Sequence, residues 1–284
     1  MPETPPFVGE VQPPALHLMT LNLRRRMPAW RPGRADRWET RRPALARLLE
    51  VERPSILGLQ EVLPDQSREV EAMLGDGYVS AGSGRERGGL GERCELHVDA
   101  ERLRIVGERT WWLSNSPGVP GSRSFGNLFP RIVVQVELQD RATLTRFHVL
   151  VTHLDHLSER SRRAAAGLIR AEVESLDAPA AVLGDFNTGA GSATHRALTG
   201  GPLADSFDLA RERLDPGFGS YSHYRPPRVG ARRLDWILVS RGTAVDAAGV
   251  DAARPLGVAV SDHDPVHAVV RWDAGADGGA PSEG

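Results

Sequence analysis

The sequence predicts an α/β protein whose β-sheets are mixed or antiparallel rather than wholly parallel. Short apolar runs of strand length outnumber the helical segments along the chain. Two of these runs, 132–138 and 147–153, are joined by a short polar link, which is typical of a β-hairpin. The 284 residues, 40% of them hydrophobic, suffice for a two-sheet sandwich that folds as one domain.

Each expected element follows from its local pattern. Helices are expected at 37–51, 66–74 and 159–176, and the last is the clearest because Ser158 is a favourable N-cap and Pro179 follows the segment. Strands are expected at 16–22, 56–60, 94–98, 132–138, 147–153, 180–185, 234–239 and 266–272.

Two tails flank the predicted domain, which covers residues 15–273. Residues 1–14 are proline-rich, and residues 274–284 contain almost nothing that could be buried, so we expect both tails to be disordered. No apolar run has the length of a membrane span, and the N-terminus shows no basic-then-apolar leader. The expected location is the cytoplasm.

The charges favour local rather than general recognition of anions. All 35 basic residues are arginine, and the formal net charge is -2, so the whole chain does not attract a polyanion. The arginine-rich stretch 24–42 is either a solvated face or a polyanion patch. The one cysteine, Cys94, excludes an intramolecular disulfide and a cysteine-rich zinc site.

Polar side chains that could carry chemistry stand at the C-terminal ends of apolar strands. They are Asn22, Glu61, His153, Asp185 and Asn187. Burying such a group without a partner costs a few kcal/mol. One shared site, lined by all five, explains their position.

The oxygen side chains among them predict a site for Mg²⁺ or Mn²⁺. Hard cations bind through one or two carboxylates and keep several waters, a role that Glu61 and Asp262 fit. Asn22 and Asn187 can hold a water, the metal or a phosphate oxygen without adding negative charge. The chain has no His-Glu-x-x-His helix and no Cys/His cluster, which argues against zinc.

The order of these residues resembles that of a known family. The matching blocks are Thr20-Leu21-Asn22, Leu59-Gln60-Glu61-Val62, Gly91-Glu92, Thr152-His153-Leu154-Asp155-His156 with Arg162 in the following helix, Gly184-Asp185-Phe186-Asn187, Arg233-Leu234-Asp235-Trp236 and Ser261-Asp262-His263-Asp264-Pro265-Val266. This series is similar to the endonuclease/exonuclease/phosphatase (deoxyribonuclease I-like) superfamily, in its bacterial metal-dependent hydrolase branch. The resemblance implies a catalytic domain over residues 15–273 with a four-layer α/β/β/α sandwich, in which two packed mixed sheets are flanked by helices.

The resemblance also implies roles on the metal side of the site. Glu61, with help from Asn22 and Asp262, would hold the metal. Asp185 and Asn187 would face the scissile phosphate and the attacking water, and Asp185 would orient or deprotonate that water.

On the phosphate side, the resemblance implies two histidines. His263 would contact a non-bridging phosphate oxygen or move a proton, with Asp235 behind it. A carboxylate bonded to an imidazole raises its pKa and favours the cation beside a phosphate. His153 would lie on the other side of the phosphate, oriented by Glu92.

Further residues are candidates for binding substrate or supporting the site. Arg131 and Arg41 would contact the substrate phosphate, support the site or form structural salt bridges. Asp155 and Arg162 belong to the matching histidine block. His223 is either a substrate-loop residue or an ordinary exposed histidine.

The predicted function is metal-assisted hydrolysis of a phosphoric ester, by a phosphodiesterase, a phosphatase or a nuclease. One alternative is a binding or scaffold protein that keeps the fold without catalysis. Another is an endonuclease acting on abasic or other DNA, although Arg24 stands where abasic-site endonucleases carry an acidic residue. The expected partner is a phosphate-ester substrate, with nucleic acid left open, and we expect a monomer without a membrane span.

Overall fold

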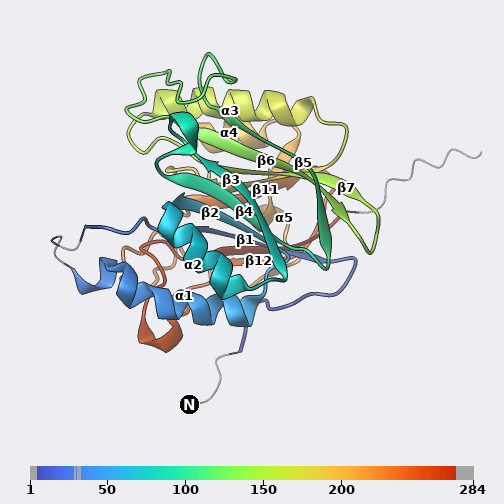
Figure 1. Cartoon of the computed structure of the whole chain (residues 1–284). Coiled ribbons are helices and arrows are strands. Elements are labelled where there is room, and N and C mark those ends of the chain that lie inside the picture. Colours follow the sequence, from blue (N-terminus) through green and yellow to red (C-terminus); the bar gives the residue numbers. More distant parts are fainter. Residues whose placement is uncertain (1–4, 29, 31–32, 273–284) are drawn as a thin grey trace, which may run out of the picture.

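The structure is a computed structural model that describes residues 5–28, 30 and 33–272, and within them two sheets pack face to face (Figure 1). The seven-stranded sheet has the order β10 (Glu212–Arg213), β12 (Ala244–Val250), β13 (Val266–Arg271), β1 (Leu16–Asn22), β2 (Ile56–Val62), β4 (Arg93–Asp99) and β3 (Tyr78–Gly84). The six-stranded sheet has the order β5 (Leu103–Trp112), β6 (Ile132–Asp140), β7 (Arg146–His153), β8 (Ala180–Asp185), β11 (Asp235–Ser240) and β9 (Leu203–Asp205). Both sheets are mixed, since the pairs β1–β2 and β7–β8 are parallel and most other neighbours are antiparallel.

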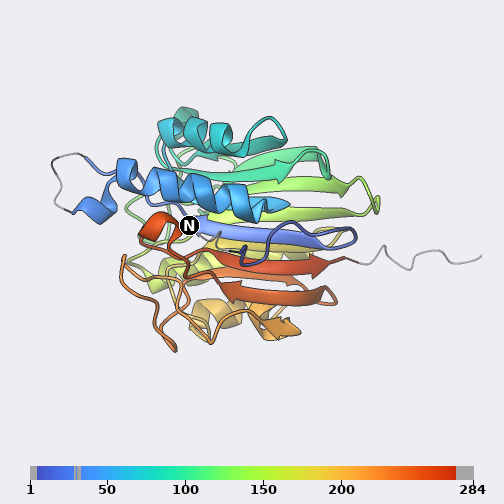
Figure 2. The same cartoon turned by 90° about the horizontal axis from the view of Figure 1, so that it is seen from below.

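Helices cover the outer face of each sheet. Figure 2 shows α1 (Trp38–Glu52) and α2 (Pro64–Leu74) lying across the seven-stranded sheet, while α3 (Glu159–Glu174) and α4 (Ala193–Thr199) cover the other sheet. The connections contain α5 (Ser206–Leu209) and the short turns η1 (Arg34–Asp36), η2 (Arg87–Gly89) and η3 (Pro255–Gly257). The predicted four-layer sandwich is therefore confirmed. None of the described helices is long and apolar enough to cross a membrane.

Apolar clusters between the layers hold the described part of the chain together. The cluster between the sheets includes Leu18 of β1 and Leu183 of β8. A second joins the six-stranded sheet to α3 and α4 and includes Val182, and a third joins the other sheet to α1 and α2 and includes Met19. Neighbouring residues such as Leu18 and Met19 thus pack on opposite faces, which explains why the central strands read as continuous apolar runs.

Most of the predicted elements lie where the sequence places them. The strands predicted at 16–22 and 180–185 match β1 and β8, and the predicted hairpin is the antiparallel pair β6–β7. The predicted helices correspond to α1, α2 and α3, with ends shifted by one or two residues.

Sequence reasoning did not identify β3, β5, β9, β10, β12, α4 or α5. Four of these strands, β3, β5, β9 and β10, are the edge strands of the two sheets. Edge strands bury less side-chain surface than central ones, so their sequences lack the continuous apolar run that marks a central strand. In β5, for example, exposed and half-buried residues make up most of the strand, and Gly107 interrupts it.

The expected N-terminal tail differs from the described structure. Residues 1–4 and 273–284 lie outside the described residues, but 5–14 are described and lie against the body. The carboxylate of Glu52, at the end of α1, accepts hydrogen bonds from the backbone N–H groups of Phe7, Val8 and Gly9. Because backbone groups make these contacts, the proline-rich composition does not reveal them.

Gly184 fixes the close approach of β8 to β7 directly before Asp185. Its φ is 153°, a backbone conformation that residues with a side chain rarely adopt. A Cβ built there would lie 1.9 Å from the carbonyl oxygen of Thr152. We predict that Gly184→Ala lowers the free energy of unfolding by more than about 3 kcal/mol, as measured by urea denaturation.

Gly167 is a matched control, because a Cβ built at this position of α3 meets no atom within 4 Å. Gly167→Ala should leave stability unchanged or raise it by up to about 1 kcal/mol. A Gly184→Ala protein as stable as the wild type would contradict this account of the β7–β8 contact.

Candidate active site

Strand ends from both sheets meet at one edge of the sandwich. The parallel strands β7 and β8 end there with His153 and Asp185, which are paired in register. The antiparallel strand β11 begins at the same edge, so Asp235 lies opposite Asp185. Together with Asn22 at the end of β1, these ends surround a pocket of about 510 Å³. Its lining is Arg24, Arg25, Glu61, Arg85, Glu92, Phe129, Arg131, His153, His156, Asp185, Asn187, Tyr221, Leu234, Asp262 and His263.

Asp185 is the centre of this arrangement. Its Oδ2 accepts a hydrogen bond from Asn22 Nδ2 at 3.0 Å, and it lies 3.6 Å from His153 Nε2 and 3.8 Å from His263 Nε2. Burial, together with the nearby carboxylate of Asp235, raises the pKa of Asp185 to about 7. A carboxyl group with this pKa can either hold or accept a proton near neutral pH.

His263 is held by a buried carboxylate behind it. Its Nδ1 lies 2.8 Å from Asp235 Oδ2, and the hydroxyl of Ser220 donates to the same oxygen at 2.6 Å. Burial alone would lower the pKa of His263, but Asp235, Asp185 and Asp262 raise it well above its usual value. The ring is therefore an imidazolium that can donate a proton or a hydrogen bond from Nε2.

His153 has the opposite protonation. Burial, together with the cations of Arg131 and Arg85, holds the pKa of His153 well below its usual value. The two rings that face Asp185 are thus one neutral imidazole and one imidazolium. Groups whose environments push their pKa values apart are typical of sites that perform acid–base chemistry.

The oxygen ligands predicted for a metal lie on the other side of Asp185. Asn22 Nδ2 also donates to Glu61 Oε1 at 3.1 Å, so the amide of Asn22 bridges the Glu61 and Asp185 carboxylates. Asp262 Oδ2 lies 3.6 Å from Arg24 Nε, and Arg24 is held in turn by two hydrogen bonds to Asp36. Glu61 and Asp262 therefore both present carboxylate oxygens to the pocket.

Local turns hold the strand ends in place. Asn22 Oδ1 accepts the backbone N–H of Arg24 at 2.9 Å, and Asp185 Oδ1 accepts that of Asn187 at 2.8 Å. In each turn a side chain bonds to the backbone two residues on, a habit of Asn and Asp. Glu61, Arg24 and Asn187 have left-handed backbones with φ of 59°, 57° and 53°, a conformation that non-glycine residues adopt when the surroundings enforce it.

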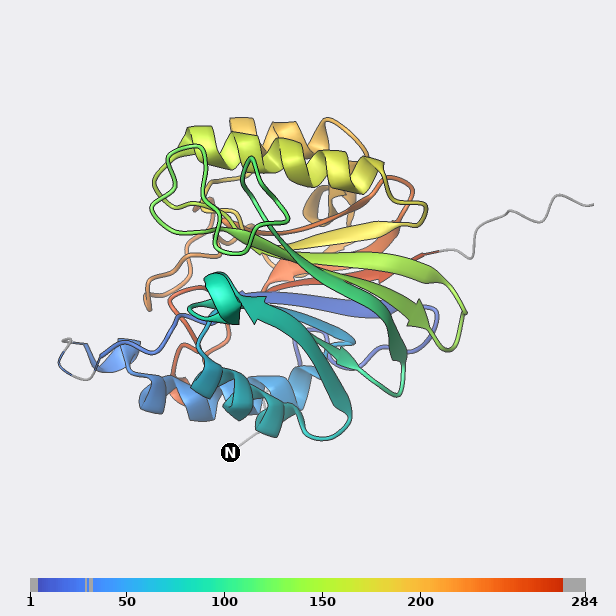
Figure 3. The same ribbon diagram turned by 45° about the horizontal axis from the view of Figure 1, so that its top comes forward.

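A cationic wall lies beside His153. The guanidinium of Arg131 is buried, its Nη2 lies 3.1 Å from His156 Nδ1, and its Nε lies 3.8 Å from Asp155. Arg131 Nη1 and Nε have no hydrogen-bond partner in the described part of the chain. Arg131 is the last residue of the long β5–β6 connection, residues 113–131, which lies beside α3 in Figure 3. Arg131 therefore lines the pocket with a guanidinium whose hydrogen-bonding capacity is only partly used by the described residues.

Other predicted residues support the site from behind or at its rim. Arg41 is buried and donates to the carbonyl oxygens of Leu23, Arg24 and Val260, so it positions backbone and does not reach the pocket. Arg162 Nη1 donates to the carbonyl oxygen of Asp155.

The observed contacts of Glu92 and His223 differ from those predicted from the sequence. Among the described contacts, Glu92 pairs with Arg85 and Arg25 and not with His153. Glu92 was predicted to orient His153, but no described contact between the two side chains supports this role. His223 is exposed, and its backbone N–H donates to the carbonyl oxygen of Asp262.

Comparison with known proteins now identifies the family. A family model described as the endonuclease/exonuclease/phosphatase family matches residues 19–263. The chain belongs to this family. The matched range contains every residue placed above around Asp185, and the resemblance inferred from the sequence blocks is confirmed. A search of curated proteins found no match.

Solved structures of this family share the whole architecture. A protein of the endonuclease/exonuclease/phosphatase family from Bacteroides thetaiotaomicron is 28% identical, covers 93% of this chain and 100% of its own, and has a TM-score of 0.85. A mannosyl-6-phosphatase from the same organism is 27% identical over 90% of this chain and 100% of its own, with a TM-score of 0.82. The human Nocturnin catalytic domain is 18% identical over 90% and 93%, with a TM-score of 0.67, and shows the fold alone.

The family blocks found in the sequence account for the residues gathered around Asp185, but not for the whole lining of the pocket. Sequence reasoning left out Arg85, Phe129 and Tyr221, all of which line it. Arg85 lies in a loop that follows the edge strand β3, and its guanidinium stacks on Phe129 at 4.8 Å from the ring centroid. These contacts join segments that are far apart in the sequence, so no local sequence pattern predicts them.

The pKa of His263 should depend on Asp235. Asp235→Asn removes a carboxylate 2.8 Å from Nδ1, so the pKa of His263 should fall by about 1–3 pH units. The imidazolium would then be lost at lower pH than in the wild type. Ring chemical shifts in an NMR titration report this pKa directly.

Asp208→Asn is the control, because this carboxylate is exposed and its ion pair is with Arg213, away from the pocket. It should leave the His263 titration unchanged. An unaltered His263 pKa in Asp235→Asn would show that the carboxylate does not hold the imidazolium.

Proposed function

We propose that this family member is a divalent-metal-dependent hydrolase of phosphoric monoesters, with substrates of sugar-phosphate size. The observation that carries the proposal is that Asp185, His153 and His263 meet in one small pocket with the buried guanidinium of Arg131. A pocket of about 510 Å³ has the size of a small-ligand site. The similarity to a mannosyl-6-phosphatase supports the same class.

The residues present fit Mg²⁺ or Mn²⁺. Glu61 and Asp262 would hold the ion, and their donor set is wholly oxygen, as hard cations require. The amide of Asn22 would keep the Glu61 carboxylate in place through the hydrogen bond at 3.1 Å. A bound ion supplies neutralisation of the charge that develops on the phosphate and polarises a bound water.

The protein groups would perform the proton transfers. Asp185, with a pKa of about 7, would orient the attacking water and accept its proton. His263, as the imidazolium, would donate a hydrogen bond to a non-bridging phosphate oxygen or a proton to the leaving group. Neutral His153 would donate from the other side of the phosphate.

Arg131 favours a monoester over a diester. A phosphoric monoester carries more negative charge and one more terminal oxygen than a diester, and so gains more from an extra guanidinium. Two N–H groups of Arg131, at Nη1 and Nε, have no hydrogen-bond partner among the described residues. We propose that the guanidinium would bind that extra oxygen. Buried N–H groups without acceptors are costly, so a bound anion that accepted from Arg131 Nη1 or Nε would also offset their desolvation.

The completeness of the constellation supports catalysis rather than a scaffold role. All eight predicted residues are present. Six of them line the pocket: Glu61, His153, Asp185, Asn187, Asp262 and His263. The other two, Asn22 and Asp235, bond to lining residues. A protein that only bound a partner would gain nothing from buried groups with opposed pKa shifts.

Hydrolysis of matched esters tests the proposal. With Mg²⁺ or Mn²⁺, the wild type should cleave sugar phosphates and aryl phosphates faster than the corresponding methyl diesters, and a chelator should abolish cleavage. Glu61→Gln should weaken metal activation. Arg131→Gln should lower kcat/KM for monoesters by about 10- to 100-fold and change that for diesters much less.

Arg104→Gln is the matched control, because Arg104 is exposed in β5 and bonds to Gln139 away from the pocket. It should leave all rates unchanged. Faster cleavage of diesters or of DNA than of monoesters would overturn the monoester assignment, and absence of any metal-dependent cleavage would overturn the function itself.

A further inference from the structure

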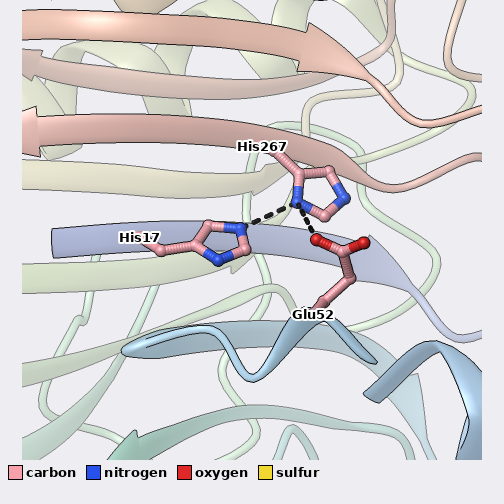
Figure 4. A group of neighbouring side chains, drawn as sticks. All are labelled: His17, Glu52 and His267. Atoms are coloured by element: carbon pink, nitrogen blue, oxygen red, sulfur yellow. Dashed lines mark hydrogen bonds and ion pairs between the residues drawn. The ribbon is translucent and has the colours of Figure 1, made fainter. Parts of the chain in front are cut away.

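A second group of metal-ligand residues lies at the opposite end of β1 from the active site. His17, Glu52 and His267 are all buried, and one nitrogen or oxygen atom from each lies within 4.8 Å of the others (Figure 4). His17 and Asn22 are five residues apart along β1, which places the two clusters about 16 Å apart. The three residues come from β1, the end of α1 and β13, so no local motif joins them.

The hydrogen bonds of this cluster leave a metal-binding nitrogen on His17. His17 Nδ1 lies 2.9 Å from the carbonyl oxygen of Gly9, which can only accept, so Nδ1 carries the proton. His17 Nε2 therefore has a lone pair directed at His267 Nδ1, 2.9 Å away. Metal-bound histidines commonly donate their other N–H to a backbone carbonyl in this way.

The surroundings contain buried negative charge without a matching cation. Among the described residues, the ion-pair partner of the buried Glu52 carboxylate is His267, at 4.0 Å. Burial and the neighbouring Glu52 also raise the pKa of the buried Asp251 to about 6.

His267 is incompletely bonded. Its Nε2 is fully buried and has no hydrogen-bond partner in the described part of the chain. The hydrogen bond between the two rings requires a proton on His267 Nδ1, which leaves a bare lone pair on Nε2. An ion held by both rings would instead use the Nδ1 lone pair and place the proton on Nε2, near the ring of Phe7, whose centroid lies 5.3 Å from that of His267.

We propose that His17, Glu52 and His267 form a second metal site, for a zinc-like divalent cation, that fastens segment 5–14 to the sandwich. The ligands would be His17 Nε2, His267 Nδ1 and a carboxylate oxygen of Glu52, with a water in the fourth position. Two nitrogens and one oxygen suit Zn²⁺ or Co²⁺ and not Mg²⁺.

The present spacing is close to that of a loaded site. Ligand atoms on a tetrahedral ion with bonds of about 2.0–2.1 Å lie about 3.3 Å apart. The His17–His267 and His267–Glu52 distances of 2.9 and 4.0 Å lie on either side of this value. All three ligand atoms lie within 4.8 Å of one another, so adjustments of the side chains alone would bring them onto one ion.

Binding of a metal would also stabilise segment 5–14, which contacts two of the proposed ligands. Glu52 bonds to the backbone of Phe7, Val8 and Gly9, and His17 bonds to the carbonyl oxygen of Gly9. A metal that fixes Glu52 and His17 thus also fixes this segment. Sequence reasoning argued against zinc because it looked for ligands close together in sequence.

Cobalt absorption distinguishes this site from the active site. Four-coordinate Co²⁺ with nitrogen ligands absorbs visible light several-fold more strongly than six-coordinate Co²⁺ held by oxygens. Metal-stripped full-length protein should therefore gain an intense visible band that saturates at one equivalent. The double variant Glu61→Gln/Asp262→Asn should keep this band, whereas Glu52→Gln and His267→Gln should lose most of it.

His97→Gln is the matched control, because His97 is a buried histidine next to a buried glutamate, Glu95, in the same sheet. It should keep the band. Loss of the band in the active-site double variant, or its persistence in folded His267→Gln, would overturn the proposal, as would a wild type without an intense band.

A second measurement covers the case in which the cluster variants do not fold. In the wild type and in Glu61→Gln/Asp262→Asn, Zn²⁺ should slow amide hydrogen exchange at Phe7, Val8 and Gly9. Equal exchange rates with and without Zn²⁺ would overturn the proposal, whether or not the active site binds metal or catalyses hydrolysis.

Discussion

The structure depends on several carboxylates that are gathered at a single edge of the sandwich and linked there by shared hydrogen-bond partners. Asp185 and Asp235 face each other across neighbouring strands, and Glu61 is tied to Asp185 through Asn22. Buried carboxylates repel each other unless cations or hydrogen-bond donors compensate them. Here the imidazolium of His263 provides part of the compensation, and a divalent cation at Glu61 would provide more. Burial, together with this repulsion from Asp235, raises the pKa of Asp185 into the range useful for a base.

The two-sheet architecture makes this gathering possible. Parallel strands bring their C-terminal ends to one edge, and an antiparallel neighbour brings its N-terminal end to the same place. The continuous apolar strands supply rigid backbones on which these ends are fixed. Buried Arg41 and half-buried Arg162 then donate hydrogen bonds that secure the connecting backbone. Sequence positions more than two hundred residues apart, such as Asn22 and Ser261, thereby come within hydrogen-bonding distance at 2.6 Å.

The central strands, and the gathering of polar residues at their ends, were predictable from the sequence, whereas the edge strands and the long-range contacts were not. A polar residue ending a buried strand, such as Asp185, stands out because the surrounding run is apolar. No local sequence pattern identifies Arg85 or the pair His17–His267 as part of a site, because their contacts form only when separate elements pack together. The N-terminal segment was misleading for a related reason, since its contacts to Glu52 use backbone N–H groups that composition does not describe.

The central claim is that the pocket binds a divalent cation at the Glu61 side and a phosphate between Asp185, His263 and Arg131. A crystal structure with Mn²⁺ and inorganic phosphate, with anomalous scattering used to locate manganese, tests it most directly. We expect a manganese peak bonded to carboxylate oxygens of Glu61, with a phosphate next to it in contact with Arg131 and the ring of His263. Manganese absent from Glu61, or phosphate bound elsewhere at saturating concentrations of both, would contradict the account.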